Sequence, residues 1–372
     1  MNDKPKDDND LLQEGTLTAD PTDDCDDMKT PPGAPEPAGK DGKDKDKVEP
    51  LSDVFDVAWE RMTARADGKE PPIKTPWETL DTALGGGIYS GELIPVVGNT
   101  GIGKTQWAME IAYYAAKAGH PVYYVAMESD EPDLVSRLMG LEYRHQTGKA
   151  VSWSDDLYKG RKPKLLADVA RDTRNPLRSL SLYFIFGHPL EWHPSSLEDS
   201  LASHEAEEKR PLVIVDFLQL VGPDPDNAQP DPRNRIMSAA YYLRIMAKDY
   251  NATVLAISST ARNNYDLFDG SIPAFELGKT NPKKLEGSGK EAGEIEYAAA
   301  TIIALCRERG EREESKPVWV AVVKARFGKT GWVGALPYGE HGFGEMKKPG
   351  QPKRQEQSKT KPATKGGDPY GE

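Results

Sequence analysis

Cysteine is scarce in this chain of 372 residues, which contains only Cys25 and Cys306. Two cysteines cannot build a disulfide framework or a cysteine-rich metal site. Long hydrophobic runs are also missing, since no stretch of about 18 apolar residues occurs, and a membrane span is therefore excluded. The charged N-terminus has no apolar segment and does not match a secretory signal peptide. We expect a cytoplasmic protein without a membrane partner.

The chain has fewer basic than acidic residues, and its share of apolar residues is low. The chain has 48 lysine and arginine residues against 60 acidic residues, a formal net charge of −12. An overall basic protein is therefore excluded, although a local basic channel is not. Apolar residues make up 37% of the chain, below the roughly 45–50% of globular proteins, so part of the chain is expected to stay unfolded.

Two terminal segments explain this shortage. Residues 1–50 contain 15 acidic and 7 basic residues and few large apolar side chains, which predicts a disordered acidic tail. Residues 344–372 contain seven basic and four acidic residues, which predicts a disordered basic tail. A partner-binding acidic tail and an electrostatic tether to nucleic acid are the alternatives to plain unstructured termini.

Residues 51–72 are expected to form a helix and a linker. Apolar residues at spacings of three and four predict an amphipathic helix over about 52–66, with Ser52 as its N-cap, before Pro71 and Pro72 end it. Such a helix must bury its apolar stripe, either against its own core or against a neighbouring subunit.

Residues 73–343 are expected to form the folded domain. Short apolar runs rich in β-branched residues alternate there with helical segments, which predicts an α/β fold with a mainly parallel sheet flanked by helices. Glycines between the last two strands predict a C-terminal β-hairpin. The expected strands include 93–97, 121–126, 182–186, 212–215, 253–258, 301–305 and 318–324. The expected helices are 105–118, 131–140, 195–209 and 234–250.

A phosphate-binding pattern, G-x-x-x-x-G-K-[ST], follows the first of these strands and opens a helix. Its glycines let successive backbone N–H groups converge on phosphate oxygens, and the helix N-terminus adds partial positive charge. Lys104 would reach the β- and γ-phosphates, and the Thr105 hydroxyl would bind Mg²⁺. The pattern therefore predicts a site for ATP and Mg²⁺. The residues assigned to the nucleotide are Gly98, Asn99, Thr100, Gly101, Ile102, Gly103, Lys104 and Thr105.

Two carboxylates at the ends of expected strands extend this site. Asp216 ends the apolar run 212–215 and is expected to be the second Mg²⁺ group. Glu128 follows the strand at 121–126, at the edge where doubly wound sheets bind ligands, and is expected to orient and polarise the attacking water. Either carboxylate could instead be only a helix cap.

The motifs together resemble the ATPase domain of replicative ring helicases of the DnaB type, within the RecA-like fold. The resemblance runs over roughly 74–336, and its strongest parts are the phosphate loop, residues 216–220 and residues 324–331. The last of these is similar to the family's Lys-x-Arg-x-Gly-x-x-Gly hairpin. One departure is Ser259, which stands where the family has glutamine.

The resemblance implies a mechanism shared between subunits. It implies that Lys324 and Arg326 are catalytic groups that reach the nucleotide of a neighbouring subunit in a hexameric ring. Lys104 and Glu128 would be the catalytic groups of the subunit that binds the nucleotide. Gln219 would sense the γ-phosphate or the DNA state. The implied activity is that of an ATP-dependent DNA helicase moving on single-stranded DNA, with replication or recombination proteins as possible partners of the tails.

Residues 262–293 are rich in glycine, lysine and polar side chains and are expected to form a long loop. Loops at this place in RecA-like rings line the central channel, which implies contacts to the DNA backbone. A plain flexible loop is the alternative. The residues assigned to nucleic acid are Arg262, Lys283, Lys284 and Lys290.

Two other functions stay open at this stage. The chain could be a recombination ATPase similar to RecA or RadA, which coats DNA as a filament without unwinding it. It could also be a regulatory or loader ATPase that acts on protein partners. Stimulation of ATP hydrolysis by single-stranded DNA separates the last possibility from the others.

Overall fold

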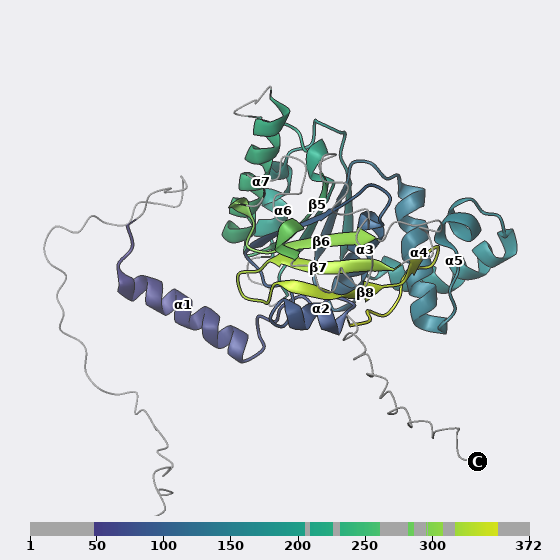
Figure 1. Ribbon diagram of the computed structural model, residues 1–372, viewed down its shortest axis with the longest axis horizontal. Coiled ribbons are helices and arrows are strands. Elements are labelled where there is room, and N and C mark those ends of the chain that lie inside the picture. The colour runs from purple at the N-terminus through teal and green to yellow at the C-terminus, as the bar shows by residue number, and fades with distance from the viewer. Residues whose placement is uncertain are drawn as a thin grey trace, which may run out of the picture. The chain divides into compact units, whose positions relative to one another are not determined.

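A single large sheet forms the centre of the computed structural model (Figure 1). The structure describes residues 48–204, 209–225, 231–260, 282–285, 295, 297–307 and 317–348. The chain divides into two units, Met1–Asp56 and Val57–Glu372, and each is described by itself. Most of the two expected tails lies outside the described residues, and the first unit contributes only residues 48–56.

Eight strands build the sheet, in the spatial order β3-β2-β4-β5-β1-β6-β7-β8. The pairs from β3 to β6 are parallel, whereas β6, β7 and β8 pair antiparallel. The mainly parallel sheet and the C-terminal hairpin are thus confirmed. The strands are β1 (Glu92–Gly98), β2 (Val122–Ala126), β3 (Leu182–Phe186), β4 (Leu212–Asp216), β5 (Thr253–Ser259), β6 (Ile302–Arg307), β7 (Val318–Lys324) and β8 (Gly331–Leu336).

The helices connect these strands, and none in the described ranges is long and apolar enough to cross a membrane. They are α1 (Leu51–Ala66), α2 (Glu78–Ala83), α3 (Lys104–Lys117), α4 (Glu131–Thr147), α5 (Pro163–Arg178), α6 (Glu198–Ala202) and α7 (Pro232–Asp249). Shorter helical turns are η1 (Trp153–Tyr158), η2 (Pro194–Leu197), η3 (Leu218–Leu220) and η5 (Pro282–Leu285).

Some predicted helix boundaries are wrong. Helix α4 continues past 140 to Thr147, where Gly148, at a φ of 69°, forms its C-cap. Helix α1 begins at Leu51, so Ser52 lies in its first turn and is not the N-cap. Of the helix predicted over 195–209, the described part up to residue 204 contains only a turn and the short α6, and residues 205–208 lie outside the described residues. Helices α2 and α5 were not predicted from the sequence.

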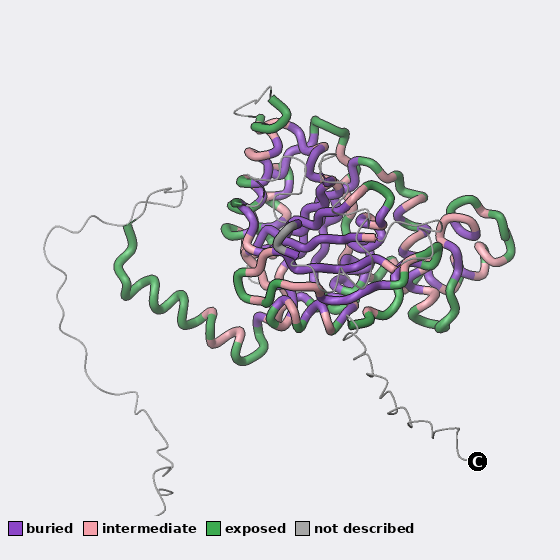
Figure 2. Tube along the Cα trace, in the orientation of Figure 1, coloured by how far each residue is buried: buried purple, intermediate pink, exposed green. Residues whose placement is uncertain are grey.

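Successive side chains of a strand point to opposite faces, so the sheet has two cores. In β4, Leu212 and Ile214 pack with α2, α3 and α4, whereas Val213 and Val215 pack with α6 and α7. Figure 2 shows the central strands as a buried layer between these helices. The packing on both faces holds the ends of β1, β2 and β4 in place, and these ends carry the predicted site.

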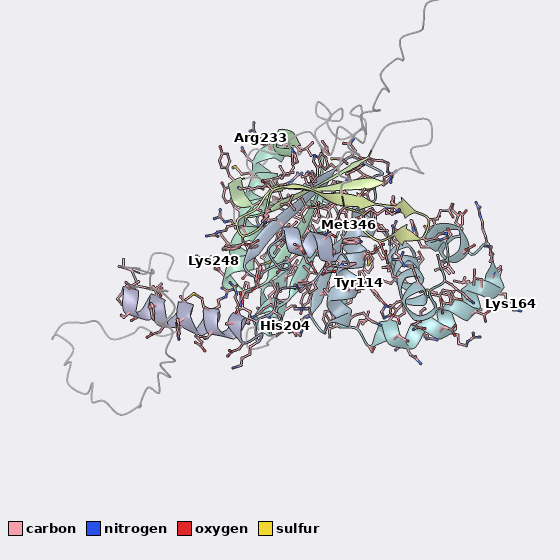
Figure 3. The ribbon with its side chains drawn as sticks, turned by 60° about the horizontal axis from the view of Figure 1, so that its bottom comes forward. Tyr114, Lys164, His204, Arg233, Lys248 and Met346 are labelled. Atoms are coloured by element: carbon pink, nitrogen blue, oxygen red, sulfur yellow. The ribbon has the colours of Figure 1, made fainter. Side chains whose placement is uncertain are left out.

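The chain after β8 folds back over the domain, and we call residues 337–347 the C-terminal strap. It contains the small hairpin of β9 (Tyr338–Gly339) and β10 (Gly342–Phe343). The backbone of Lys347 pairs with Ala335 in β8, with N–O distances of 2.8 and 2.9 Å. Met346, labelled in Figure 3, packs against Gly334 of β8. The described domain therefore extends beyond residue 343, the end expected from the sequence.

Charge anchors the second half of α1 to the domain. Arg61 and Arg65 both pair with the buried carboxylate of Glu70, at 3.1 and 3.0 Å, and Arg61 also donates to the Ser90 hydroxyl at 3.1 Å. Apolar residues of this half nevertheless stay exposed in the chain. They are Trp59 and Met62. The domain's own core therefore does not cover this part of the predicted stripe.

Candidate functional site

The phosphate-binding pattern forms the loop between the end of β1 and the start of α3. Gly101 and Gly103 have φ angles of 80° and 99°, a conformation that residues with a side chain rarely adopt. A β-carbon on Gly103 would come within 2.7 Å of Cζ of Tyr338. The loop therefore needs its glycines, and it leads into the N-terminus of a helix of 14 residues, where backbone N–H groups favour phosphate.

Lys104 is the first residue of α3 and is only 9% exposed. Its ammonium group donates to the backbone oxygens of Gly98, at 2.7 Å, and Asn99, at 2.9 Å. Burial lowers the pKa of Lys104 to about 8, while the negative charges of Asp216 and Glu128 act to raise it. Lys104 is thus already held inside the loop, where phosphate oxygens would be stronger partners than carbonyl groups.

Asp216 ends β4 and is 4% exposed. Its Oδ2 accepts a hydrogen bond from the Tyr124 hydroxyl at 2.8 Å, and the Thr105 side chain also bonds to it. Burial raises the pKa of Asp216, and these two bonds and Lys104 oppose the rise. Magnesium usually binds one or two carboxylates together with phosphate oxygens. The oxygen donors of Asp216 and Thr105 therefore fit a magnesium ion held jointly with a nucleotide.

Glu128 lies beside this pair, two residues after β2. The parallel register puts Ala126 opposite Asp216, and the Met127 N–H donates to the Asp216 backbone oxygen at 3.1 Å. The charge of Glu128 acts on the pKa of both Lys104 and Asp216. Glu128 is exposed, so its carboxylate can contact a water molecule at this edge. The structure thus brings these predicted residues together at the carboxyl edge of the sheet.

Gln219 connects the carboxyl ends of β4 and β5. Its Nε2 donates to the Ser258 hydroxyl at 2.9 Å, and its Oε1 accepts from the Ser259 backbone N–H at 3.4 Å. The amide of Gln219 therefore lies against the position where the family has glutamine. This contact links the strand that ends in Asp216 to the chain that continues beyond Ser259.

Lys324 and Arg326 lie at the opposite edge of the sheet. Lys324 ends β7, and both residues lie beside Glu92, the first residue of β1. The phosphate loop begins at the other end of β1, whose seven residues span about 20 Å at about 3.3 Å per residue. Neither side chain can therefore reach a phosphate group on the loop of its own chain.

A recess of about 310 Å³ opens beside these two cations. It is lined by Arg244, Arg326 and Glu92, the first residue of β1, which is 7% exposed. Oε2 of Glu92 accepts from the Thr301 hydroxyl at 3.3 Å, and Oε1 has no hydrogen-bond partner among the described residues. Burial raises the pKa of Glu92, while the Thr301 bond and the charges of Arg326 and Arg65 act to lower it. Sequence reasoning assigned Glu92 no functional role.

Tyr338 is a second residue that sequence reasoning missed. Its ring lies against Gly103 of the phosphate loop and stacks on Phe343, with centroids 4.4 Å apart. The Arg307 guanidinium lies 5.2 Å from the centroid of the same ring. No spacing in the sequence connects the strap to a loop so far upstream, so only the folded chain shows this contact.

The predicted DNA contacts are not tested by the structure. Arg262 and Lys290 lie outside the described residues. Lys283 and Lys284 belong to the turn η5, but their side chains also lie outside the described residues. The turn interrupts the loop expected over 262–293, and Leu285 packs in the core formed by β6 and β7.

The chain is similar in sequence to two known groups of proteins. RadA, a DNA repair protein of Bacillus subtilis, is 22% identical over 290 residues, which are 78% of this chain and 48% of RadA. The replicative DNA helicase DnaB of Synechocystis is 26% identical over 195 residues, 52% of this chain and 21% of DnaB. The chain thus spans about half or less of the length of these curated relatives.

Two solved structures share the fold. The first, an ATPase domain, aligns with a TM-score of 0.62 at 17% identity, over 81% of this chain and all of that one. The second, a DnaB-like replicative helicase studied with primase, aligns with a TM-score of 0.61 at 17% identity, over 81% of this chain and 68% of that one. The family model of the DnaB-like helicase C terminal domain matches residues 72–340. Most of the chain lies in this match and carries the phosphate loop, Asp216 and the C-terminal hairpin, and the chain therefore belongs to the family of DnaB-like helicase C-terminal domains.

Proposed function

We propose that this chain is an ATP-dependent DNA helicase of the replicative ring type, which hydrolyses ATP at subunit interfaces while moving on single-stranded DNA. Membership in the family implies ATP hydrolysis with Mg²⁺, and the proposal adds the interface and the DNA. The observation that carries it is the separation of the cations. Lys104 lies at one edge of the sheet, and Lys324 and Arg326 lie at the other, beside the start of β1, whose seven residues span about 20 Å.

Each residue at the phosphate loop would have a separate role in hydrolysis. Lys104 would bind the β- and γ-phosphates, and Thr105 and Asp216 would hold magnesium, which neutralises charge on phosphate oxygens when bound. Glu128 would orient a water molecule and accept its proton. Tyr338, which lies against Gly103, would flank the bound nucleotide.

A second copy of the chain would complete the site. Its Lys324 and Arg326 would stabilise the charge that develops on the transferring γ-phosphoryl group, as an arginine finger does. We propose a closed ring of six copies, with Gln219 relaying the nucleotide state towards the chain after Ser259. Arg262, Lys283, Lys284 and Lys290 are proposed to contact the DNA backbone, and the tails to contact replication or recombination proteins.

A mixing experiment tests the shared site. We expect Lys104→Ala and Arg326→Ala to be inactive alone and to recover ATPase activity when mixed, because an intact loop in one subunit then meets an intact finger in another. Phosphate release is measured over a range of ratios, with and without single-stranded DNA. If folded and assembled mixtures show no recovery at any ratio, the shared site is wrong. If DNA does not stimulate the wild type, a protein-directed ATPase is favoured.

A recombination ATPase is the second candidate. The RadA match covers more of this chain than the DnaB match does, and Ser259 departs from the helicase motif. A forked DNA duplex separates the two functions, because a ring helicase would unwind it and a filament-forming ATPase would not. Particle images with ATP and single-stranded DNA, showing closed rings or open filaments, give an independent answer.

A further inference from the structure

The C-terminal strap contacts the phosphate loop through Tyr338, whose ring lies against Gly103. Phe343 stacks on Tyr338 and lies edge-on to Trp77, with a centroid distance of 6.0 Å. The Trp77 indole N–H donates to the Gly344 backbone oxygen at 3.1 Å. The position of Tyr338 on Gly103 therefore depends on how the strap is held.

Two side chains from helices α3 and α4 hold the strap by its backbone. Arg144 Nη1 donates to the backbone oxygens of His341 and Phe343, both at 2.9 Å. Glu110 Oε1 accepts the Phe343 backbone N–H at 2.7 Å. Arg144 Nη2 also lies 3.7 Å from Glu110 Oε2, so the two side chains and the strap form one charged cluster.

The contact with the strap distinguishes this cluster from a neighbouring ion pair between α3 and α4. Glu142 is a second buried carboxylate between α3 and α4, and its Oε2 accepts from the Tyr113 hydroxyl at 2.6 Å and from Lys117 at 3.3 Å. That pair bonds only within the two helices. Glu110 and Arg144 instead bond to a segment about 200 residues away in sequence, and a β-carbon on Gly342 would come within 2.5 Å of Glu110 Oε1.

Burying a carboxylate is unfavourable unless hydrogen bonds compensate it. Glu110 receives such compensation from the strap and from Gln106 Nε2 at 3.2 Å, and it lies on the helix that begins with Lys104. Helix α3 thus fixes both Lys104 in the phosphate loop and the strap that covers the loop. A shift of the strap would move Tyr338 away from Gly103 without displacing Lys104.

We propose that Glu110 and Arg144 are positioning residues for nucleotide binding: they clamp the strap so that Tyr338 closes one side of the phosphate loop. The proposal rests on the proposed function only in that the loop binds ATP. The clamp touches neither the phosphate groups nor the water-activating carboxylate. Loosening it therefore weakens nucleotide affinity and raises KM, while kcat at saturating ATP stays nearly constant.

Arg144→Met in the full chain tests the clamp, with Lys117→Met as its matched control. Both cations lie between α3 and α4 beside a buried carboxylate, with side chains 28% and 32% exposed, but only Arg144 reaches the strap. Binding of a fluorescent ATP analogue with Mg²⁺ is measured. We expect Arg144→Met to bind about tenfold more weakly, the equivalent of one hydrogen bond to a charged group. Lys117→Met should bind like the wild type.

A double-mutant cycle shows whether the effect passes through Tyr338. In a Tyr338→Ala background, Arg144→Met should cause no further loss of affinity, because the ring that the clamp positions is gone. A full tenfold loss in that background would overturn the proposal. Hydrogen exchange of the Phe343 amide supplies a readout without nucleotide, and it should be faster in Arg144→Met than in Lys117→Met.

Three outcomes are then distinguishable. If the wild type binds the analogue and Arg144→Met binds equally well, the clamp is wrong and the proposed function stands. If the wild type does not bind the analogue, the proposed function fails, and slow exchange at Phe343 in Arg144→Met would overturn the clamp as well. Should Arg144→Met not fold, Arg144→Lys, which can donate to only part of the strap, is expected to show a smaller loss of affinity.

Discussion

The two edges of the central sheet differ in how completely their charged groups are satisfied. At the carboxyl edge, Lys104 donates to two backbone oxygens, and Asp216 accepts from Tyr124. At the opposite edge, where β1 begins and which we call the amino edge, Glu92 is buried. Its Oε1 has no hydrogen-bond partner among the described residues, and it lies beside a recess that Arg326 also lines.

This difference indicates what each edge can supply. The carboxyl edge has its loop, its cation and its carboxylates in place within one chain, as a nucleotide site requires. The amino edge presents cations with no phosphate group of its own within reach. Under the proposed function each edge is half of a catalytic unit, and the following changes test that comparison from the largest expected effect to the smallest.

Lys104→Ala should have the largest effect, because it removes the cation of the carboxyl edge. We expect nucleotide binding to be lost and turnover to fall by at least about 10³-fold. Phosphate release and binding of a fluorescent ATP analogue measure the two effects, with circular dichroism as the control for folding. A folded variant that keeps more than a tenth of the wild-type rate would contradict the assignment of the loop.

Arg326→Ala should remove turnover but not binding, which separates the amino edge from the carboxyl edge. We expect kcat to fall by about 10³-fold, as for a lost arginine finger, with unchanged affinity of the chain for nucleotide. Lys329→Ala is the matched control, since Lys329 is an exposed cation of the same hairpin. Equal losses in the two variants would show that general hairpin charge, and not a finger, is responsible.

Glu110→Gln should change how stability depends on pH. Burial raises the pKa of Glu110 from 4.5 to about 7, and the bond from Phe343 and the charge of Arg144 only partly oppose this. Between those two values the unfolded chain binds fewer protons than the folded one, so stability falls as pH rises from 4.5 to 7 and is constant above. Relative to Glu110→Gln, the wild type should lose roughly 3 kcal/mol of unfolding free energy over this window. Denaturant unfolding at pH 5 and pH 8 measures it, and parallel profiles would refute the assignment.

Glu70→Gln should show the opposite sign and a smaller size at the amino edge. Burial acts to raise the pKa of Glu70, but bonds and charges from Arg61, Ser90 and Arg65 outweigh it, and the net shift is downward from 4.5. The carboxylate therefore stabilises the fold above pH 4.5 and loses this contribution as pH falls below that value. We expect the variant to be about 1 kcal/mol less stable at pH 7, since both arginines are partly exposed. The difference should shrink in acid, and a constant difference would contradict the ion pairs.

The parts of the site that were predictable are those encoded locally. The phosphate loop has fixed spacing, and Asp216 and Glu128 directly follow apolar strands, so a parallel sheet brings their strand ends to one edge. The alternation of strands and helices also predicted the sheet. The exact ends of α4 and α6 were not predictable, because caps and packing set them.

Glu92, Tyr338 and the pair Glu110 and Arg144 could not be found in this way. Each gains its importance from a contact with a residue far along the chain, as Arg144 does with His341. No periodicity marks such a contact. A buried carboxylate also looks the same in sequence whether it binds within its helix pair, as Glu142 does, or holds a distant segment.

The sequence by itself determined the α/β class, the phosphate loop and the residues that would bind Mg²⁺, because backbone geometry and strand ends follow from local residue types. Only the tertiary structure decided that Lys324 and Arg326 lie beside the start of β1, at the opposite end of that strand from the loop, and that the strap rests on Gly103. Strand order and long-range hydrogen bonds depend on how all layers pack together, and no short stretch of sequence contains that information.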